Sequence, residues 1–316
     1  MKRREFIGAA SAAAAALPLQ RLLAEEPADQ PAKERAKDDW SIRYVLSSAL
    51  FGDLPLAEVL AQVAPSGSES VDIWRKRHAT HREQITAMGD AAFQNLLKTH
   101  KTRMDISTCY PLGPFRQDDE LRWLKKNGGR MTVCGSGSMG KKDPRGAEAK
   151  KQVAAWFEKL KPHAELAGEL GLTMAIENHK NSMLSSPDSI RYFGELNPFK
   201  QVGIAFAPHH LHDTIDEIPK LIRELGDANI PFIYFQEYGI GSKKTVAKEI
   251  ELEQLPGRGT LDYVPIVQAL RAINFSGLAE IFMHPTPRGG PMLPTAEAIT
   301  KEVKRSKDYI GICLGA

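Results

Sequence analysis

The chain has 316 residues, of which 42% are hydrophobic and 26% are charged, as is ordinary for a globular protein. Its 42 Lys and Arg residues nearly balance its 39 Asp and Glu residues, and the resulting net charge of +3 argues against a nucleic-acid-binding protein. The cysteines have no CxxC spacing, which argues against a disulfide framework and a zinc knuckle; they are Cys109, Cys134 and Cys313.

Residues 1–24 have the pattern of an export signal. Lys2-Arg3-Arg4 precedes an Ala-rich apolar run that is too short to span a membrane. The Arg3-Arg4-x-Phe6-Ile7 pattern resembles a twin-arginine signal and predicts export, by the twin-arginine machinery, to the periplasm or another extracytoplasmic site. The alternative is an Ala-rich amphipathic helix. A polar linker is predicted for residues 25–40, and no later stretch is apolar for long enough to predict a membrane span.

Residues 41–316 alternate eight times between a short apolar run and a helical pattern. The apolar runs predict parallel strands buried on both faces: Tyr44–Leu46, Val71–Trp74, Met104–Thr108, Arg130–Cys134, Leu172–Ile176, Val202–Phe206, Ile230–Phe235 and Leu278–Phe282. The helices are predicted at Leu56–Val63, His81–His100, Asp118–Lys126, Ala147–Gly168, Ser186–Leu196, Ile215–Leu225, Leu261–Ile273 and Thr295–Tyr309. Eight such units curl a parallel sheet into a closed barrel, so the predicted fold is α/β, a single-domain (β/α)8 TIM barrel.

A doubly wound open sheet is the main alternative fold. Such sheets often carry a phosphate-binding GxGxxG or GxxxxGK[ST] motif after the first strand, and this sequence has neither motif there. The Gly-rich run Gly135–Gly140 is not followed at once by a helix start. It therefore predicts a flexible loop more than a phosphate-binding one.

Two carboxylates stand out in the late strands. Glu177 directly follows the apolar run Leu172–Ile176, and Glu280 interrupts the apolar run Leu278–Phe282. In a closed barrel the carboxyl ends of all strands meet at one mouth. Two buried carboxylates at that mouth repel each other unless a cation lies between them. The sequence thus predicts Glu177 and Glu280 as a catalytic pair that also binds a divalent metal.

Four segments resemble the xylose-isomerase-like TIM-barrel superfamily of sugar (phosphate) isomerases and epimerases: Met174–His179, Gly203–His210, Leu255–Asp262 and Gly277–Glu280. The resemblance implies one divalent metal held by Glu, Asp, His and Glu at the ends of the fifth to eighth strands. Here Ala207 replaces the Asp and Gln236 replaces the His, while His210 of the family pattern is kept. The implied metal ligands are Glu177, Gln236, Glu280 and His210. Their oxygen atoms favour Mn²⁺ or Mg²⁺, with Zn²⁺ as the alternative.

Three more residues are candidates for substrate binding, as His210 also is. His179 follows Glu177 by two positions and is predicted to hydrogen-bond the substrate or to act as a second acid or base. Trp74 either stacks on a sugar or packs inside the barrel. Arg258 either pairs with an anionic substrate or lies exposed.

Several alternatives stay open at this mouth. Glu237 follows Gln236 directly, and a slip of one residue would exchange which of them points inward. Glu177 could be a rim carboxylate paired with Lys180. The histidines of the run His209–His212 suggest either a zinc cluster or a solvated loop.

The predicted function is a sugar or sugar-derivative isomerase or epimerase that acts by metal-stabilised enediolate proton transfer on a small carbohydrate. One alternative is a lyase or hydrolase that acts on keto-sugars by β-elimination. Another is a non-catalytic carbohydrate-binding barrel that has lost metal ligands, as Ala207 and Gln236 suggest. The DNA-repair endonuclease branch of the same fold is rejected, because it needs a histidine-rich multi-zinc site at the strand ends and the positions Glu177, Ala207, Gln236 and Glu280 supply no histidine.

Overall fold

The computed structural model describes residues 40–315, and these form one closed barrel of eight parallel strands in chain order. The strands are β1 (Arg43–Ser47), β2 (Ser70–Trp74), β3 (Met104–Thr108), β4 (Met131–Gly135), β5 (Thr173–Glu177), β6 (Val202–Phe206), β7 (Phe232–Phe235) and β8 (Leu278–Ile281). The barrel closes where β1 pairs with β8, and in this pairing Val45 lies opposite Glu280. The predicted (β/α)8 barrel is confirmed.

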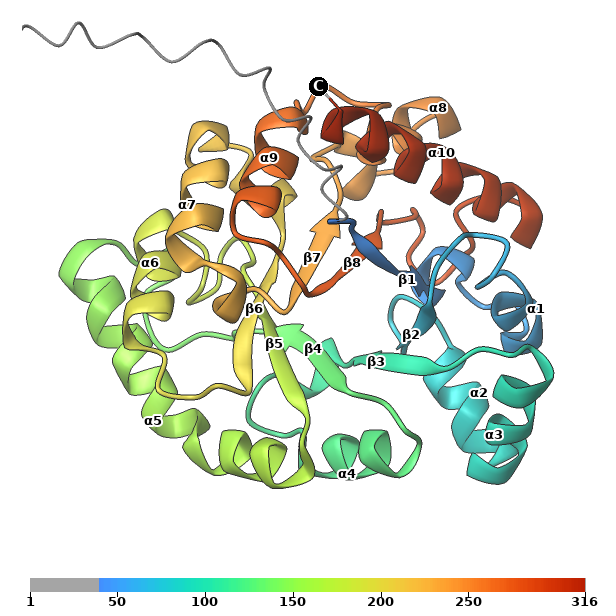
Figure 1. Ribbon diagram of the computed structural model, residues 1–316, viewed down its shortest axis with the longest axis horizontal. Coiled ribbons are helices and arrows are strands. Elements are labelled where there is room, and N and C mark those ends of the chain that lie inside the picture. Colours follow the sequence, from blue (N-terminus) through green and yellow to red (C-terminus); the bar gives the residue numbers. More distant parts are fainter. Residues whose placement is uncertain (1–39, 316) are drawn as a thin grey trace, which may run out of the picture. The chain divides into compact units, whose positions relative to one another are not determined.

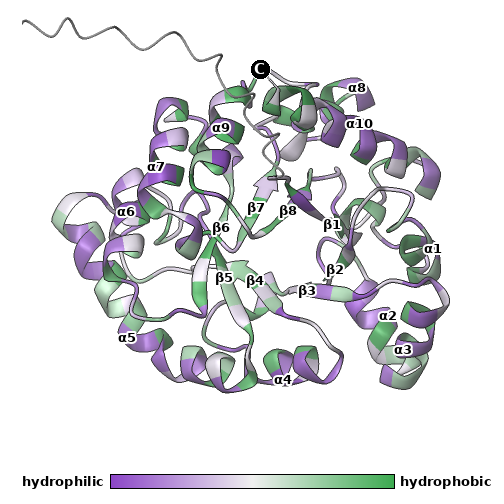
Figure 2. Cartoon of the chain, viewed as in Figure 1, coloured by the Kyte–Doolittle hydropathy of each residue, from purple (hydrophilic) through white to green (hydrophobic). Residues whose placement is uncertain are grey.

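Helices surround the barrel on the outside (Figure 1). They are α1 (Leu56–Ala61), α2 (His81–Met88), α3 (Asp90–Thr99), α4 (Asp118–Lys126), α5 (Gly146–Leu170), α6 (Pro187–Leu196), α7 (Ile218–Leu225), α8 (Lys248–Glu251), α9 (Val264–Ala272) and α10 (Ala296–Leu314). Each longer helix buries one apolar stripe; on α5 this includes Val153, Trp156, Phe157 and Leu160, which recur at helical spacing. Figure 2 shows the same striping, with polar residues on the outer helix faces.

The single helix predicted for His81–His100 is two helices, and this prediction is corrected. Gly89 separates α2 from α3 and adopts a φ of +82°, outside the helical region, which costs glycine little. The helical pattern on both sides of Gly89 hid the break from sequence reasoning.

The predicted signal at residues 1–24 lies outside the described residues, as does the predicted linker up to Asp39. Both therefore stay predictions. Within residues 40–315, no helix is long and apolar enough to cross a membrane.

An aromatic layer, made of Trp74, Tyr234 and Phe282, crosses the barrel interior near its mouth. The rings of Trp74 and Phe282 stack with centroids 4.8 Å apart, and the ring of Tyr234 lies 5.4 Å from that of Phe282. Trp74 follows Asp72 by two residues on β2, and Phe282 follows Glu280 by two residues along β8. Because side chains two apart share a face of a strand, Trp74 and Phe282 lie on the mouth side of Asp72 and Glu280, while Tyr234 is paired in register with Glu280.

Candidate functional site

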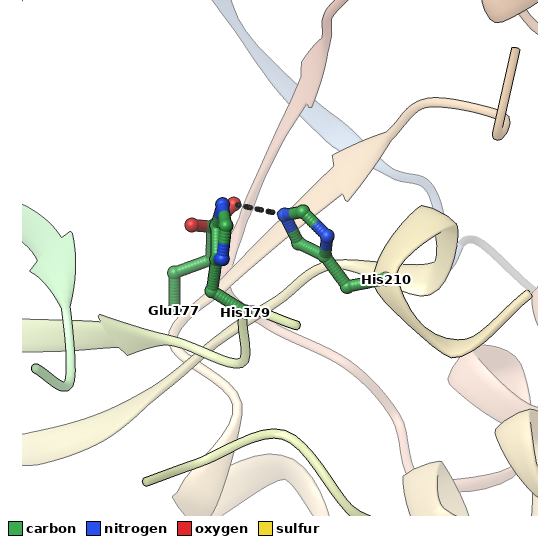
Figure 3. Close-up of side chains that lie close together, drawn as sticks. All are labelled: Glu177, His179 and His210. Atoms are coloured by element: carbon green, nitrogen blue, oxygen red, sulfur yellow. Dashed lines mark ion pairs between the residues drawn. The ribbon is translucent and has the colours of Figure 1, made fainter. Parts of the chain in front are cut away.

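Three side chains meet at the carboxyl ends of β5 and β6, and we call them the Glu-His-His cluster: Glu177, His179 and His210 (Figure 3). One ligand atom of each lies within 4.8 Å of the others. The Oε1 atom of Glu177 is 3.7 Å from Nε2 of His210, and the His179 and His210 rings are 3.9 Å apart between centroids. The sequence predicts a substrate-binding role for His179, whereas the structure places it with these potential metal ligands.

Backbone and side-chain hydrogen bonds join the two segments that carry the cluster. Asn178 accepts from the backbone nitrogen of Ala207 at 2.7 Å and donates to the oxygen of Ala207 at 3.0 Å. This pairing fixes the end of β5 against the segment that leads to His210. Ala207 itself brings no ligand, but its backbone sets the position of its neighbours.

The hydrogen bonds of His179 leave one ring nitrogen available. Its Nδ1 lies 2.8 Å from the backbone oxygen of Lys180, so Nδ1 carries the proton and Nε2 is left as an acceptor or ligand. Lys180 in turn forms an ion pair with Asp213. The alternative that pairs Lys180 with Glu177 is therefore not what the structure shows.

Burial sets the charge states of the cluster. Burial raises the pKa of Glu177 above its ordinary value, with the charge of His179 opposing the shift. Burial, then the neighbouring His209, lowers the pKa of His210 well below the usual histidine range. His210 is therefore neutral at neutral pH, which is the form of imidazole that binds a metal.

The cluster borders a cavity of about 470 Å³ at the barrel mouth. The lining residues are Arg77, His78, Tyr110, Pro111, Glu177, His179, His284 and Arg288. The volume lies in the range of small-molecule sites. Burial is the main cause that lowers the pKa of His78 to about 4, and the nearby charge of Arg288 adds to it, so a second neutral imidazole faces the cavity. Sequence reasoning missed His78 and His284, although both follow the ends of predicted strands, β2 and β8.

Several buried polar atoms here have no hydrogen-bond partner among the described residues. They are Oε2 of Glu177, Nε2 of His210, both ring nitrogens of His209, Oε1 of Gln236, Nδ1 of His284 and Nη1 of Arg288. Native proteins pair nearly all buried polar atoms, so these unpaired atoms at the strand ends are open to a ligand. Glu177 and two imidazoles fit a divalent metal in particular.

Glu280 is neither in this cluster nor among the residues that line its cavity, and the predicted Glu177–Glu280 pair stays a prediction. Glu280 is fully buried beneath the aromatic layer, beside Asp72. Phe282 occupies the next inward position toward the mouth and stacks on Trp74, which holds Glu280 one layer deeper.

The remaining predicted site residues lie outside the cavity. Gln236 donates from Nε2 to Gln254 at 3.2 Å and does not line the cavity. Trp74 is 1% exposed and packs inside the barrel, the second of its two predicted alternatives. Arg258 forms two hydrogen bonds with Glu302 on α10, at 2.8 and 2.7 Å, so its substrate role is not supported.

Glu237 is a structural carboxylate, which settles the one-residue ambiguity at the end of β7. It accepts hydrogen bonds from the backbone nitrogens of Gly257 at 3.2 Å and Leu261 at 2.9 Å. Its side chain therefore holds the loop before α9. It does not belong to the Glu-His-His cluster.

Asp72 and Glu280 give the fold a pH-dependent stability. Burial raises the pKa of Asp72 to about 7, and burial with the charge of Asp72 raises the pKa of Glu280 well above its usual value. Thr108 donates to Asp72 at 2.6 Å. Both folded pKa values exceed the unfolded ones, which lie near 4, so the folded state binds more protons above that pH.

As far as this pair is concerned, we expect the free energy of unfolding to be highest below about pH 4, where both states are protonated, and to fall as the pH rises from there through about 7. Glu280→Gln should remove much of that slope, which is at most about 1.4 kcal/mol per pH unit for each group. Urea unfolding at pH 5, 6, 7 and 8 measures it. An unchanged slope in the variant would show that other groups cause the dependence.

Comparisons with known proteins agree with this architecture. Residues 60–309 match the model of a family described as "Xylose isomerase-like TIM barrel". A comparison with curated protein sequences found no match. Among solved structures, the IolI protein with a bound zinc atom aligns with a TM-score of 0.65 at 15% identity, over 87% of this chain and 100% of that one.

Two other solved structures are similar. D-psicose 3-epimerase, in the presence of D-fructose, has a TM-score of 0.63 at 14% identity and covers 87% of this chain and 100% of its own. The probable 3-DHS dehydratase AsbF of Bacillus anthracis has a TM-score of 0.61 at 15% identity and covers 83% and 98%. At such identities these likenesses establish the fold and leave the reaction to the site.

Proposed function

Because this chain belongs to the xylose isomerase-like TIM barrel family, we propose that it is a metal-dependent isomerase or epimerase of a sugar or sugar derivative. The observation that carries the proposal is the Glu-His-His cluster at the mouth of a cavity of about 470 Å³, with unpaired polar atoms that face no described partner. Similar solved structures include sugar epimerases and a dehydratase, which supports an enzyme of this general kind.

Glu177, His179 and His210 would hold the metal. One carboxylate and two imidazoles with an open position make up the ligand number of a catalytic zinc site. Imidazole ligands suit Zn²⁺ or Fe²⁺ more than Mg²⁺, so the proposed metal shifts from the Mn²⁺ or Mg²⁺ expected from the sequence. When bound, such a cation supplies positive charge that stabilises an oxyanion of the substrate.

The protein's own side chains would move the proton. Glu177 is the proposed base that removes a proton from the carbon beside the substrate carbonyl. His284 lines the same cavity from the loop after β8, and its Nδ1 has no described partner. It is the proposed group that returns the proton. Tyr110, which lies close enough to Glu177 for each to affect the pKa of the other, would orient that carboxylate.

The proposal is tested by proton exchange in D₂O. The protein is loaded with Zn²⁺, Fe²⁺ or Mn²⁺ in turn and incubated with a panel of ketoses, and NMR follows deuterium at the carbons beside the carbonyl. We expect one carbon to exchange and its configuration to change, or the carbonyl to migrate, and chelation should stop this. Elimination products formed from keto-sugars would instead support the lyase activity and contradict the isomerase activity. No exchange and no product with any metal would contradict both.

A further inference from the structure

Two arginines border the cavity of the Glu-His-His cluster, and we call them the rim arginines: Arg77 and Arg288. Both line the cavity of the cluster and also an adjoining surface groove of about 730 Å³. Arg77 comes from the segment after β2, and Arg288 from the loop after β8. A molecule that reached from the cavity into the groove would therefore meet residues shared by both, Arg77 and Arg288.

Arg288 is held in place and still has a free donor. Its Nη2 donates to the backbone oxygen of Ser242 at 3.1 Å, while Nη1 is buried and has no partner among the described residues. Thr286 fixes the same loop by donating from its backbone to Glu251 at 2.8 Å and from its hydroxyl to Gly241 at 2.7 Å. Arg288 therefore lines the cavity while one of its guanidinium nitrogens has no hydrogen bond to any described residue.

The close approach of Gly52 supports the other side of this loop. Its φ is +56°, and a Cβ there would lie 2.3 Å from the backbone carbon of Gly290. A side chain at position 52 would push the Arg288 loop away. The backbone is thus arranged to bring the two segments together beside the rim arginines.

The charges around the rim arginines do not cancel. Arg77 makes no hydrogen bond or ion pair with any described residue, and Lys76 lines the groove beside it. Of the described residues lining the groove, Asp53 is the only acid, and of those lining the cavity, Glu177 is the only one. The charge of Glu251 acts on the pKa of Arg288, but Glu251 already forms an ion pair with Lys248.

Arg288 is charged despite its position. Burial, then the charge of Arg77, lowers its pKa to about 10, which still leaves it protonated at neutral pH. A partly buried guanidinium without a counter-charge is unfavourable. Guanidinium groups bind carboxylate and phosphate through paired N–H donors, so such an anion would relieve that cost.

We propose that the rim arginines bind an anionic group of the substrate, so that the substrate class is an acidic sugar, either a sugar acid with a carboxylate or a phosphorylated sugar. Its reactive carbon would lie at Glu177 and its anionic end at Arg77 and Arg288. The placement of the reactive end rests on the proposed function, whereas the anion site does not. The role of pairing with an anionic substrate, which the sequence analysis gave as one alternative for Arg258, is thus assigned to Arg288.

Binding is measured by calorimetry with three probes: D-glucuronate, D-glucose 6-phosphate and neutral D-glucose. We expect at least one anionic probe to bind about ten-fold or more tightly than D-glucose, and its affinity to fall with added salt. Arg288→Gln should weaken that probe by about ten- to hundred-fold and leave D-glucose within about two-fold. The stronger of the two anionic probes identifies carboxylate or phosphate as the group bound.

Three variants keep the result interpretable. Arg77→Gln alters an exposed side chain and should weaken the anionic probe without affecting folding. Arg288→Lys keeps the charge but not the paired donors, and should retain part of the affinity. Arg223→Gln is the control. It removes an exposed charge on α7, where Nη1 of Arg223 donates only to the backbone oxygen of Pro219 in the same helix, and it should leave the affinity for the anionic probe unchanged.

Equal affinity for D-glucose and both anions, or unchanged anion affinity in Arg288→Gln and Arg77→Gln, would overturn the inference. Glu177→Gln separates it from the proposed function, because that variant should lose turnover and keep anion binding. Anion binding without any proton exchange would refute the proposed function alone. Exchange on neutral ketoses without anion preference would refute this inference alone.

Discussion

The Glu177→Gln protein is expected to exchange substrate protons about 10²–10⁴-fold more slowly than the wild type, the usual contribution of a positioned general base. Glutamine keeps the size of the side chain but cannot take up the proton. Glu177 is 4% exposed and ends β5, so the change leaves the surrounding packing intact. The rate of deuterium incorporation in the D₂O assay measures the effect.

Glu280→Gln is the matched control, because it alters a buried carboxylate that lies beneath the aromatic layer and outside the cavity. Its exchange rate should fall far less than that of Glu177→Gln. Equal losses in both variants would restore the Glu177–Glu280 pair expected from the sequence. An unchanged rate in Glu177→Gln would remove Glu177 from the mechanism.

Trp74→Ala is expected to lower the free energy of unfolding by about 3–5 kcal/mol, the cost of removing a large aromatic side chain from a core. The indole is 1% exposed, stacks on Phe282 at 4.8 Å and contacts His78 edge-on at 5.2 Å. The loss would remove the layer that separates Asp72 and Glu280 from the mouth. Urea unfolding monitored by circular dichroism measures it.

Trp123→Ala serves for comparison, since that indole is only partly buried and lies under the Arg82 guanidinium at 3.6 Å. It should cost distinctly less. A loss below about 1 kcal/mol in Trp74→Ala, together with weaker sugar binding, would show that Trp74 contacts the sugar and is not part of the core.

The barrel could be predicted from the sequence because its strands are apolar runs that are buried on both faces. Eight such strands, each followed by a helix, predict a sheet that closes into a barrel. Glu177 could be predicted for the same reason, since it ends such a run. Glu280 also lies in an apolar run, but the structure places it outside the Glu-His-His cluster and outside the lining of the cavity. The sequence does not show how deep in the barrel an inward side chain lies. Here Phe282, which stacks on Trp74, takes the inward position between Glu280 and the mouth.

The other ligands depend on loop geometry. His179 joins Glu177 because hydrogen bonds hold it within its own turn. Its backbone nitrogen donates to the backbone oxygen of Leu184 at 2.8 Å, and its Nδ1 donates to the backbone oxygen of Lys180. Arg288 and His284 belong to a loop whose position depends on contacts with Ser242 and Gln254. Such contacts between distant segments leave no periodic pattern in the sequence.

Metal content tests the central claim, the Glu-His-His cluster, most directly. The wild type, His210→Ala and His163→Ala are purified without chelator, dialysed against equimolar Zn²⁺ and analysed by mass spectrometry; His163 is the control because its ring pairs with Asp118 on the outer helices, at 2.5 Å. We predict about one firmly bound ion per chain in the wild type and in His163→Ala, and loss of most of it in His210→Ala. Metal retained by His210→Ala, or none in the wild type, would contradict the account.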